Sequence, residues 1–136
     1  MKYLAIDYGA KRIGLAMCDP DEIIVSPYAV VENDSRVPDR ILEIVHKQQI
    51  QALVIGLPLN MDGTEGPQAA LVKDFAAELT DRTDVPVHLQ DERLTSFGAY
   101  HKLTPAELTR KRKKQRLDAV AAAEILKMFL EGKNSH

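Results

Sequence analysis

Apolar residues along this chain follow two patterns, one typical of strands and one typical of helices. Residues 4–6 and 52–57 are apolar at successive positions, as expected for strands buried on both faces of a sheet. Residues 12–18, 23–31 and 85–89 predict three further strands. A proline inside the second of these three favours an edge position, because proline has no N–H to donate to a neighbouring strand.

Three other segments have the spacing of amphipathic helices. Residues 37–45 carry apolar side chains at i, i+4, i+7 and i+8 after the polar capping residues 33–35. A second stripe follows Pro67 and continues to Leu79. The third helix, predicted over residues 117–129, places an acidic residue, Asp118, on its apolar face.

The order of these elements predicts an α/β fold. Three antiparallel strands are followed by two helical crossovers, which gives a five-stranded mixed sheet flanked by helices. The first, fourth and fifth strands then run in the same direction, and their carboxyl ends share one edge. We expect residues 1–136 to form a single domain, since a chain of this length with 45% hydrophobic residues supports one core.

Acidic residues follow the strands that meet at this edge. Asp7 ends the first strand and the pair Asp91-Glu92 ends the fifth. Ligands of α/β sheets bind at the carboxyl ends of the strands, and a carboxylate on the packed face of a helix, as at Asp118, is costly unless it is paired or bound to a metal. Alternatively, Asp7 starts a turn and Asp118 favours the helix dipole.

Asp7, Glu92 and Asp118 together predict a site for Mg²⁺ or Mn²⁺, which prefer carboxylate oxygens and leave positions for substrate phosphates. Strand alternation sends Asp91 and Glu92 to opposite sides, so one of the two faces the metal. Zinc is disfavoured because the four histidines and Cys18 show no ligand spacing.

Charge is distributed unevenly along the chain. Six of the 18 Lys and Arg residues lie in the run Arg110-Lys111-Arg112-Lys113-Lys114-Gln115-Arg116. The rest of the chain therefore has 12 basic residues against 20 acidic ones. A solvated surface loop is the default interpretation of such a run, but its position before Asp118 favours contact with a nucleic-acid backbone. The single cysteine indicates a reducing cytoplasm, and no apolar segment is long enough to predict contact with a membrane.

The loop of residues 58–66 is long, polar and predicted at the same edge of the sheet. Asn60, Thr64 and the glycine backbone are suited to binding a phosphate in front of the helix that begins near Pro67. The competing interpretation is an ordinary turn at Asp62-Gly63.

Four segments, in order, resemble the signatures of the YqgF/RuvX family of the RNase H-like superfamily: Asp7-Tyr8-Gly9-Ala10-Lys11-Arg12-Ile13-Gly14, Gly56-Leu57-Pro58-Leu59-Asn60-Met61-Asp62-Gly63-Thr64, Asp91-Glu92-Arg93-Leu94-Thr95-Ser96 and Leu117-Asp118-Ala119. The resemblance covers almost the whole chain. It implies an RNase H-like nuclease in which Asp7, Glu92 and Asp118 bind the metal and Lys11, Arg12 and Arg93 contact phosphates. Arg93 pairing with a carboxylate such as Asp91 is the equal alternative.

The same resemblance implies 5′-end processing of pre-16S rRNA, with a ribosomal precursor particle as the partner, or cleavage of Holliday junctions in DNA. RNA is favoured over branched DNA as the substrate. The protein is expected to be a monomer or a homodimer, and a resolvase would have to be a dimer. Two other classes remain open. One is an ATP-binding domain of the actin-like type, disfavoured because such proteins need two domains. The other is a non-catalytic RNA- or ribosome-binding protein.

Overall fold

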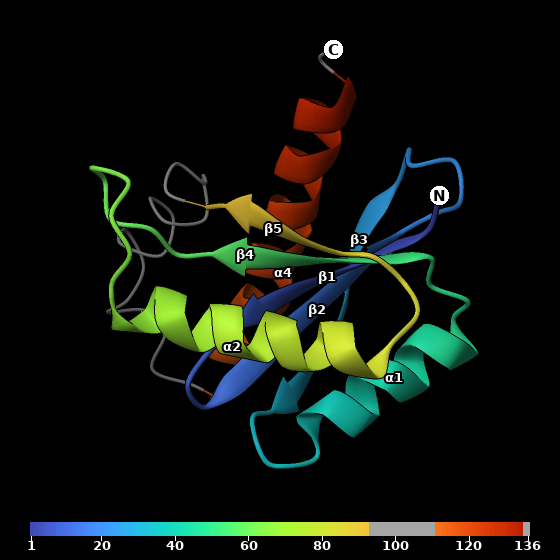
Figure 1. Ribbon diagram of the computed structural model, residues 1–136. Coiled ribbons are helices and arrows are strands. Elements are labelled where there is room, and N and C mark those ends of the chain that lie inside the picture. Colours follow the sequence, from blue (N-terminus) through green and yellow to red (C-terminus); the bar gives the residue numbers. More distant parts are fainter. Residues whose placement is uncertain (93–110, 135–136) are drawn as a thin grey trace.

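A five-stranded mixed sheet lies between helices on its two faces (Figure 1). The computed structural model describes residues 1–92 and 111–134, with side chains described for residues 1–92 and 118–133. The elements are β1 (Tyr3–Tyr8), β2 (Arg12–Cys18), β3 (Val25–Glu32), α1 (Val37–Lys47), β4 (Ala52–Leu57), α2 (Pro67–Arg82), β5 (Val87–Asp91) and α4 (Lys111–Asn134). The strand order is β3-β2-β1-β4-β5.

The predicted α/β fold class is confirmed. Strands β1, β2 and β3 form the antiparallel meander, and β1, β4 and β5 are parallel neighbours. Each of the three predicted helices is present, with Pro38 in the first turn of α1 and Pro67 at the start of α2. The carboxyl ends of β1, β4 and β5 therefore lie along one edge of the sheet.

The predicted bounds of two strands are wrong. The fifth strand, predicted over residues 85–89, is Val87–Asp91 in the structure. The third strand begins at Val25, and the preceding Ile23 and Ile24 belong to the turn after β2. The carboxylate of Asp19 accepts hydrogen bonds from the backbone N–H groups of Ile23 and Ile24, both at 2.7 Å. This local bonding takes the place of pairing in the sheet, as expected of Asp in turns.

The two faces of the sheet have cores of different character. Large aliphatic side chains such as Leu4, Ile6 and Ile55 fill the face covered by α1 and α2. On the other face, behind the sheet in Figure 1, α4 packs mainly on small side chains. These small side chains include Ala5, Ala16 and Ala52 of the sheet and Ala122 and Ala123 of the helix.

Two glycines bring α4 close to the sheet near the carboxyl end of β1. A Cβ atom at Gly14 would lie 1.9 Å from the carbonyl oxygen of Asp118, so only glycine permits this contact between β2 and α4. A Cβ atom at Gly56 would lie 2.5 Å from Cδ1 of Ile125 and 2.8 Å from Oε2 of Glu92. Both glycines sit inside strands, where glycine often marks a close approach of another chain segment.

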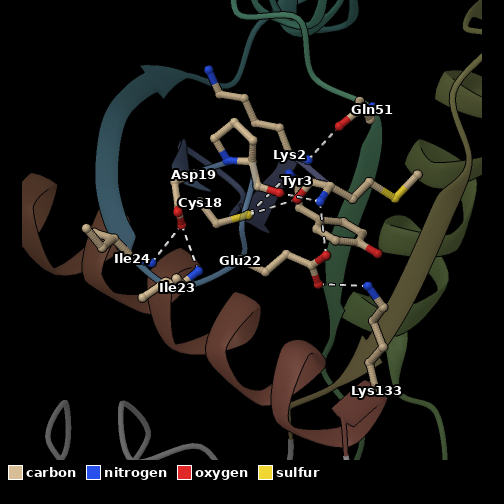
Figure 2. A network of polar contacts seen from close by, with 11 residues as sticks. Lys2, Tyr3, Cys18, Asp19, Glu22, Ile23, Ile24, Gln51 and Lys133 are labelled. Atoms are coloured by element: carbon tan, nitrogen blue, oxygen red, sulfur yellow. Dashed lines mark hydrogen bonds and ion pairs between the residues drawn. The ribbon is translucent and has the colours of Figure 1, made fainter.

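A polar network fixes α4 at the opposite end of β1 (Figure 2). The N-terminal ammonium of Met1 donates to Oε2 of Glu22 at 3.0 Å, and Lys133 donates to Oε1 of the same carboxylate at 2.7 Å. The Lys133 Nζ also lies 5.2 Å from the centre of the Tyr3 ring.

Within the part of the chain that the structure describes, no helix is long and apolar enough to cross a membrane.

Substitution of Gly14 by Ala tests the contact between β2 and α4. The added methyl group overlaps the Asp118 carbonyl, so Gly14→Ala should lower the free energy of unfolding by about 1–3 kcal/mol. Gly132→Ala in α4 is the control, because a Cβ atom there meets nothing within 4 Å. This substitution should stabilise the protein by up to about 1 kcal/mol. Urea unfolding measures both, and equal stability of the two variants would contradict the proposed contact.

Candidate active site

The three predicted acidic residues lie on the face of the sheet that α4 covers. Tyr3 and Ala5 pack beneath α4, so alternation along β1 directs Asp7 to the same face. The carboxylate of Glu92, which directly follows β5, lies beside Gly56 on this face. Asp118 is in α4, against Gly14 of β2, and Gly14 is the register partner of Asp7. All three side chains are partly buried.

Mutual repulsion and burial make two of these carboxyl groups hard to ionise. Burial, followed by the charges of Glu92 and Asp118, raises the pKa of Asp7 from 3.8 to about 7. Burial and then the charge of Asp91 raise the pKa of Glu92 from 4.5 to about 7. Shifts of this kind are typical of functional sites, where like charges are gathered for chemistry.

The alternative between Asp91 and Glu92 now has a geometric answer. Asp91 is the last residue of β5 and pairs with Leu57, whereas the Glu92 N–H donates to the Leu57 carbonyl at 3.2 Å. The Glu92 carboxylate lies beside Gly56, on the face of the sheet that α4 covers, and its charge raises the pKa of Asp7. It is therefore Glu92 that shares a site with Asp7.

Arg12 contacts one of the acids directly. Its Nε donates to Oδ2 of Asp118 at 2.8 Å, and each side chain is 24% exposed. The sequence predicted Arg12 as a phosphate contact, and the structure shows a side chain already engaged by a carboxylate. Helix α4 begins at Lys111, so Asp118 lies in the helix interior, and the alternative of a first-turn residue that favours the helix dipole is wrong.

The acids are near one another but do not form a ready-made metal cage. Among the described side chains, no group of three or more His, Cys, Asp or Glu residues is arranged so that it could hold a metal ion. The donor chemistry of Asp7, Glu92 and Asp118, all carboxylates, fits Mg²⁺ or Mn²⁺. A single ion held by all three carboxylates would need a side-chain arrangement other than the one described.

The predicted phosphate loop is bonded to itself. Asn60 donates its side-chain amide to Oγ1 of Thr64 at 2.8 Å, and the Thr64 hydroxyl donates to Oδ1 of Asp62 at 2.6 Å. The backbone N–H of Gly63 donates to the Asn60 carbonyl. Asn60 and Thr64 thus stabilise a compact exposed turn, and their role in binding phosphate stays a prediction.

Lys11 lies in the turn between β1 and β2, at the mouth of a cavity. It is exposed, and with Arg12, Asn33 and Asp34 it lines a space of about 420 Å³. The Asn33 side chain donates to the Gly9 carbonyl at 2.8 Å, which ties this turn to the end of β3. The cavity begins beside the Arg12–Asp118 pair, and its lining carries both signs of charge.

The basic run forms the start of α4 rather than a loop. Lys111, Arg112, Lys113, Lys114 and Arg116 occupy the first turns of this helix, so the surface-loop interpretation is wrong for them. Lys, Arg and Gln are good helix formers, which explains this extension. Their side chains, and the whole of Arg93 and Arg110, lie outside the described part of the chain.

Gly14 and Gly56 also shape the site, and neither was predicted from the sequence. Their signal was a glycine inside a strand pattern, which indicates a close backbone approach. His88 of β5 packs on α4, because its ring centre lies 5.1 Å from that of Phe129.

Comparison with known proteins decides the family. A family model described as "RuvX: Holliday junction resolvase" matches residues 1–132. The chain belongs to the RuvX family. A relative from Maridesulfovibrio salexigens, named "Putative pre-16S rRNA nuclease", is 44% identical over 96% of this chain and 98% of its own. One of the same name from Rhodopirellula baltica is 41% identical over 93% of this chain and 75% of its own.

Solved structures share the fold at low identity. RuvC of Thermus thermophilus, in complex with a Holliday junction substrate, has a TM-score of 0.59 at 17% identity, covering 98% of this chain and 97% of that one. The fowlpox virus Holliday junction resolvase has a TM-score of 0.53 at 11% identity, covering 98% and 99%. The RuvX chain therefore has an RNase H-like fold, and its family assigns it to the nucleases, which hydrolyse phosphodiester bonds.

The raised pKa of Asp7 predicts how stability depends on pH. The folded protein holds this proton up to about pH 7 whereas the unfolded chain loses it near pH 3.8, so stability falls as pH rises between these values. Asp7→Asn should raise the free energy of unfolding at pH 8 by about 1–3 kcal/mol. Urea unfolding in EDTA at pH 5 and pH 8 measures this effect.

Asp74→Asn, at an exposed position of α2, removes the same charge away from the site and is the control. If Asp7→Asn is no more stable than Asp74→Asn at pH 8, Asp7 is not strained by burial and repulsion.

Proposed function

We propose that this RuvX protein is a divalent-metal-dependent nuclease in which Asp7, Glu92 and Asp118 bind Mg²⁺ or Mn²⁺. The observation that carries the proposal is the placement of three carboxylates, from β1, the end of β5 and α4, on one face at the edge of the sheet. Two of them have a pKa near 7, so the site favours a positive partner. The proposal treats residues 1–136 as one nuclease domain.

Each part of the site has a distinct task in this proposal. A bound divalent cation would supply Lewis-acid stabilisation of a phosphate oxygen and a more acidic water. Asp7 and Glu92 hold the cation from the sheet, and Asp118 holds it from α4. Lys11, at the open cavity, and Arg93 orient the phosphate backbone, and Asn60 and Thr64 shape the adjoining loop.

The favoured substrate is pre-16S rRNA, which supports the cytoplasmic location expected from the sequence. The names of the relatives that match this chain over nearly its full length support this choice. A ribosomal precursor particle is the corresponding partner. The second candidate is a Holliday junction resolvase, which is favoured by the family description and by the likeness of fold to RuvC. A resolvase cuts two symmetric strands and would act as a homodimer, whereas a monomer suffices for an RNA end.

Cleavage assays with two substrates test the proposed function. With Mg²⁺ present, the protein should shorten the 5′ end of a pre-16S rRNA fragment, and Asp7→Asn or Glu92→Gln should slow this by about a hundredfold or more. Asp91→Asn is the matched control. It removes the same charge from the residue next to Glu92, and it is Glu92 that shares the site with Asp7. We expect Asp91→Asn to stay within about tenfold of the unmodified protein.

The two substrates separate the candidates. Paired symmetric cuts in a synthetic four-way junction, made by a dimer and without RNA cleavage, would establish the resolvase. Cleavage that persists in Asp7→Asn would place the activity elsewhere. Binding of rRNA without any cleavage would favour the non-catalytic class.

The basic start of α4 predicts a strong dependence of binding on salt. If Lys111, Arg112, Lys113 and Lys114 neutralise phosphates, replacing all four by Gln should reduce the slope of log affinity against log salt by about 3. The reason is that each phosphate contact releases about 0.7–0.9 of a counterion. Fluorescence anisotropy with labelled RNA gives the slope, and Lys47→Gln on α1 is the control. An unchanged slope would contradict a backbone contact.

A further inference from the structure

Arg12 is held beside the acidic site by a sheltered ion pair. Its Nε lies 2.8 Å from Oδ2 of Asp118, and both side chains are 24% exposed. Ion pairs elsewhere among the described residues have at least one more exposed side chain, for example Lys47 with Glu43, at 71% and 66%. Water screens an exposed pair, so the sheltered Arg12 is coupled more strongly to its partner.

The backbone around Asp118 leaves few ways for this carboxylate to respond. Gly14, two residues after Arg12 on β2, touches the Asp118 carbonyl, and this contact fixes the helix backbone against the strand. A change in the position of the carboxylate is therefore mainly a rotation of the Asp118 side chain. The ion pair with Arg12 determines which way that side chain points.

The acids gather beside this pair without forming a metal cage. The charge of Asp118 raises the pKa of Asp7, so the two carboxyl groups are within electrostatic reach. Yet no described group of three side chains could hold a metal ion as it stands. One oxygen of Asp118 is occupied by the guanidinium, and a divalent cation would compete with that guanidinium for the same negative charge.

We propose that Arg12 is an exchangeable counter-ion of Asp118, which it holds while the site lacks a cation and releases when a divalent cation binds between the acids. The released guanidinium is then free to contact a substrate phosphate, which joins the observed pairing with the role predicted from the sequence. Arg12 is thus a positioning residue that tunes metal affinity. The inference rests on the proposed metal-dependent function.

Mn²⁺ binding to the full chain without nucleic acid tests the exchange. Removing the competitor should strengthen binding, so the dissociation constant for Mn²⁺ should fall about tenfold in Arg12→Gln, as measured by electron paramagnetic resonance of free Mn²⁺. Lys11→Gln removes the adjacent positive charge, whose side chain is exposed, and controls for net charge. It should change the dissociation constant by less than about threefold.

Arg12→Lys is a second variant, needed in case Arg12→Gln disturbs folding. It keeps the positive charge and loses only the hydrogen bond from Nε to Asp118. We expect its Mn²⁺ affinity to lie between those of the unmodified protein and Arg12→Gln. Equal affinities for Arg12→Gln and Lys11→Gln, or weaker binding in Arg12→Gln, would overturn the exchange. If neither the unmodified protein nor Arg12→Gln binds Mn²⁺ in a manner abolished by Asp118→Asn, the metal-dependent function itself is wrong.

Discussion

The close contact between the β2 backbone and α4 is the constraint on which the site depends. Asp118 belongs to a helix that must lie almost against the strand, because its carbonyl oxygen occupies the space of a side chain at position 14. Alanines on the same face, such as Ala16 and Ala122, allow the helix to keep this distance along the sheet. A larger side chain in that layer would lift α4 and move its carboxylate away from those of β1 and β5.

The candidate site opposes folding. Carboxyl groups gathered in a partly buried space repel each other and lose hydration, and the raised pKa of Asp7 expresses that cost. The large aliphatic core on the face covered by α1 and α2 offsets it, since residues such as Leu53 and Ile55 are fully buried there. One face of the sheet thus supplies stability, and the other carries the carboxylates at a cost to it.

Much of this arrangement was predictable from the sequence, because its signals are local. Uninterrupted apolar runs marked β1 and β4, helical spacing marked α1 and α2, and the acids stood where strands end. The start of β3 was misplaced because Asp19 bonds the following backbone, a contact that an apolar pattern does not reveal.

The partners of side chains were the part that sequence reasoning missed. Arg12 and Asp118 are 106 positions apart, and their pairing follows from how α4 crosses β2. Periodicity alone gives no information on that crossing. In the same way, the glycine of a strand signals a close approach without naming the segment that approaches.

Helix α4 is held by ion pairs at two distant points along its length. Asp118 is bound to Arg12 near one end, and Lys133 is bound to Glu22 near the other, about 22 Å away along the helix axis. Between these points the buried side chains of Ala122, Ile125 and Leu126 pack the helix on the sheet. The basic turns that begin at Lys111 lie beyond Asp118, on the side away from Lys133, so the contacts of Asp118 also position those turns.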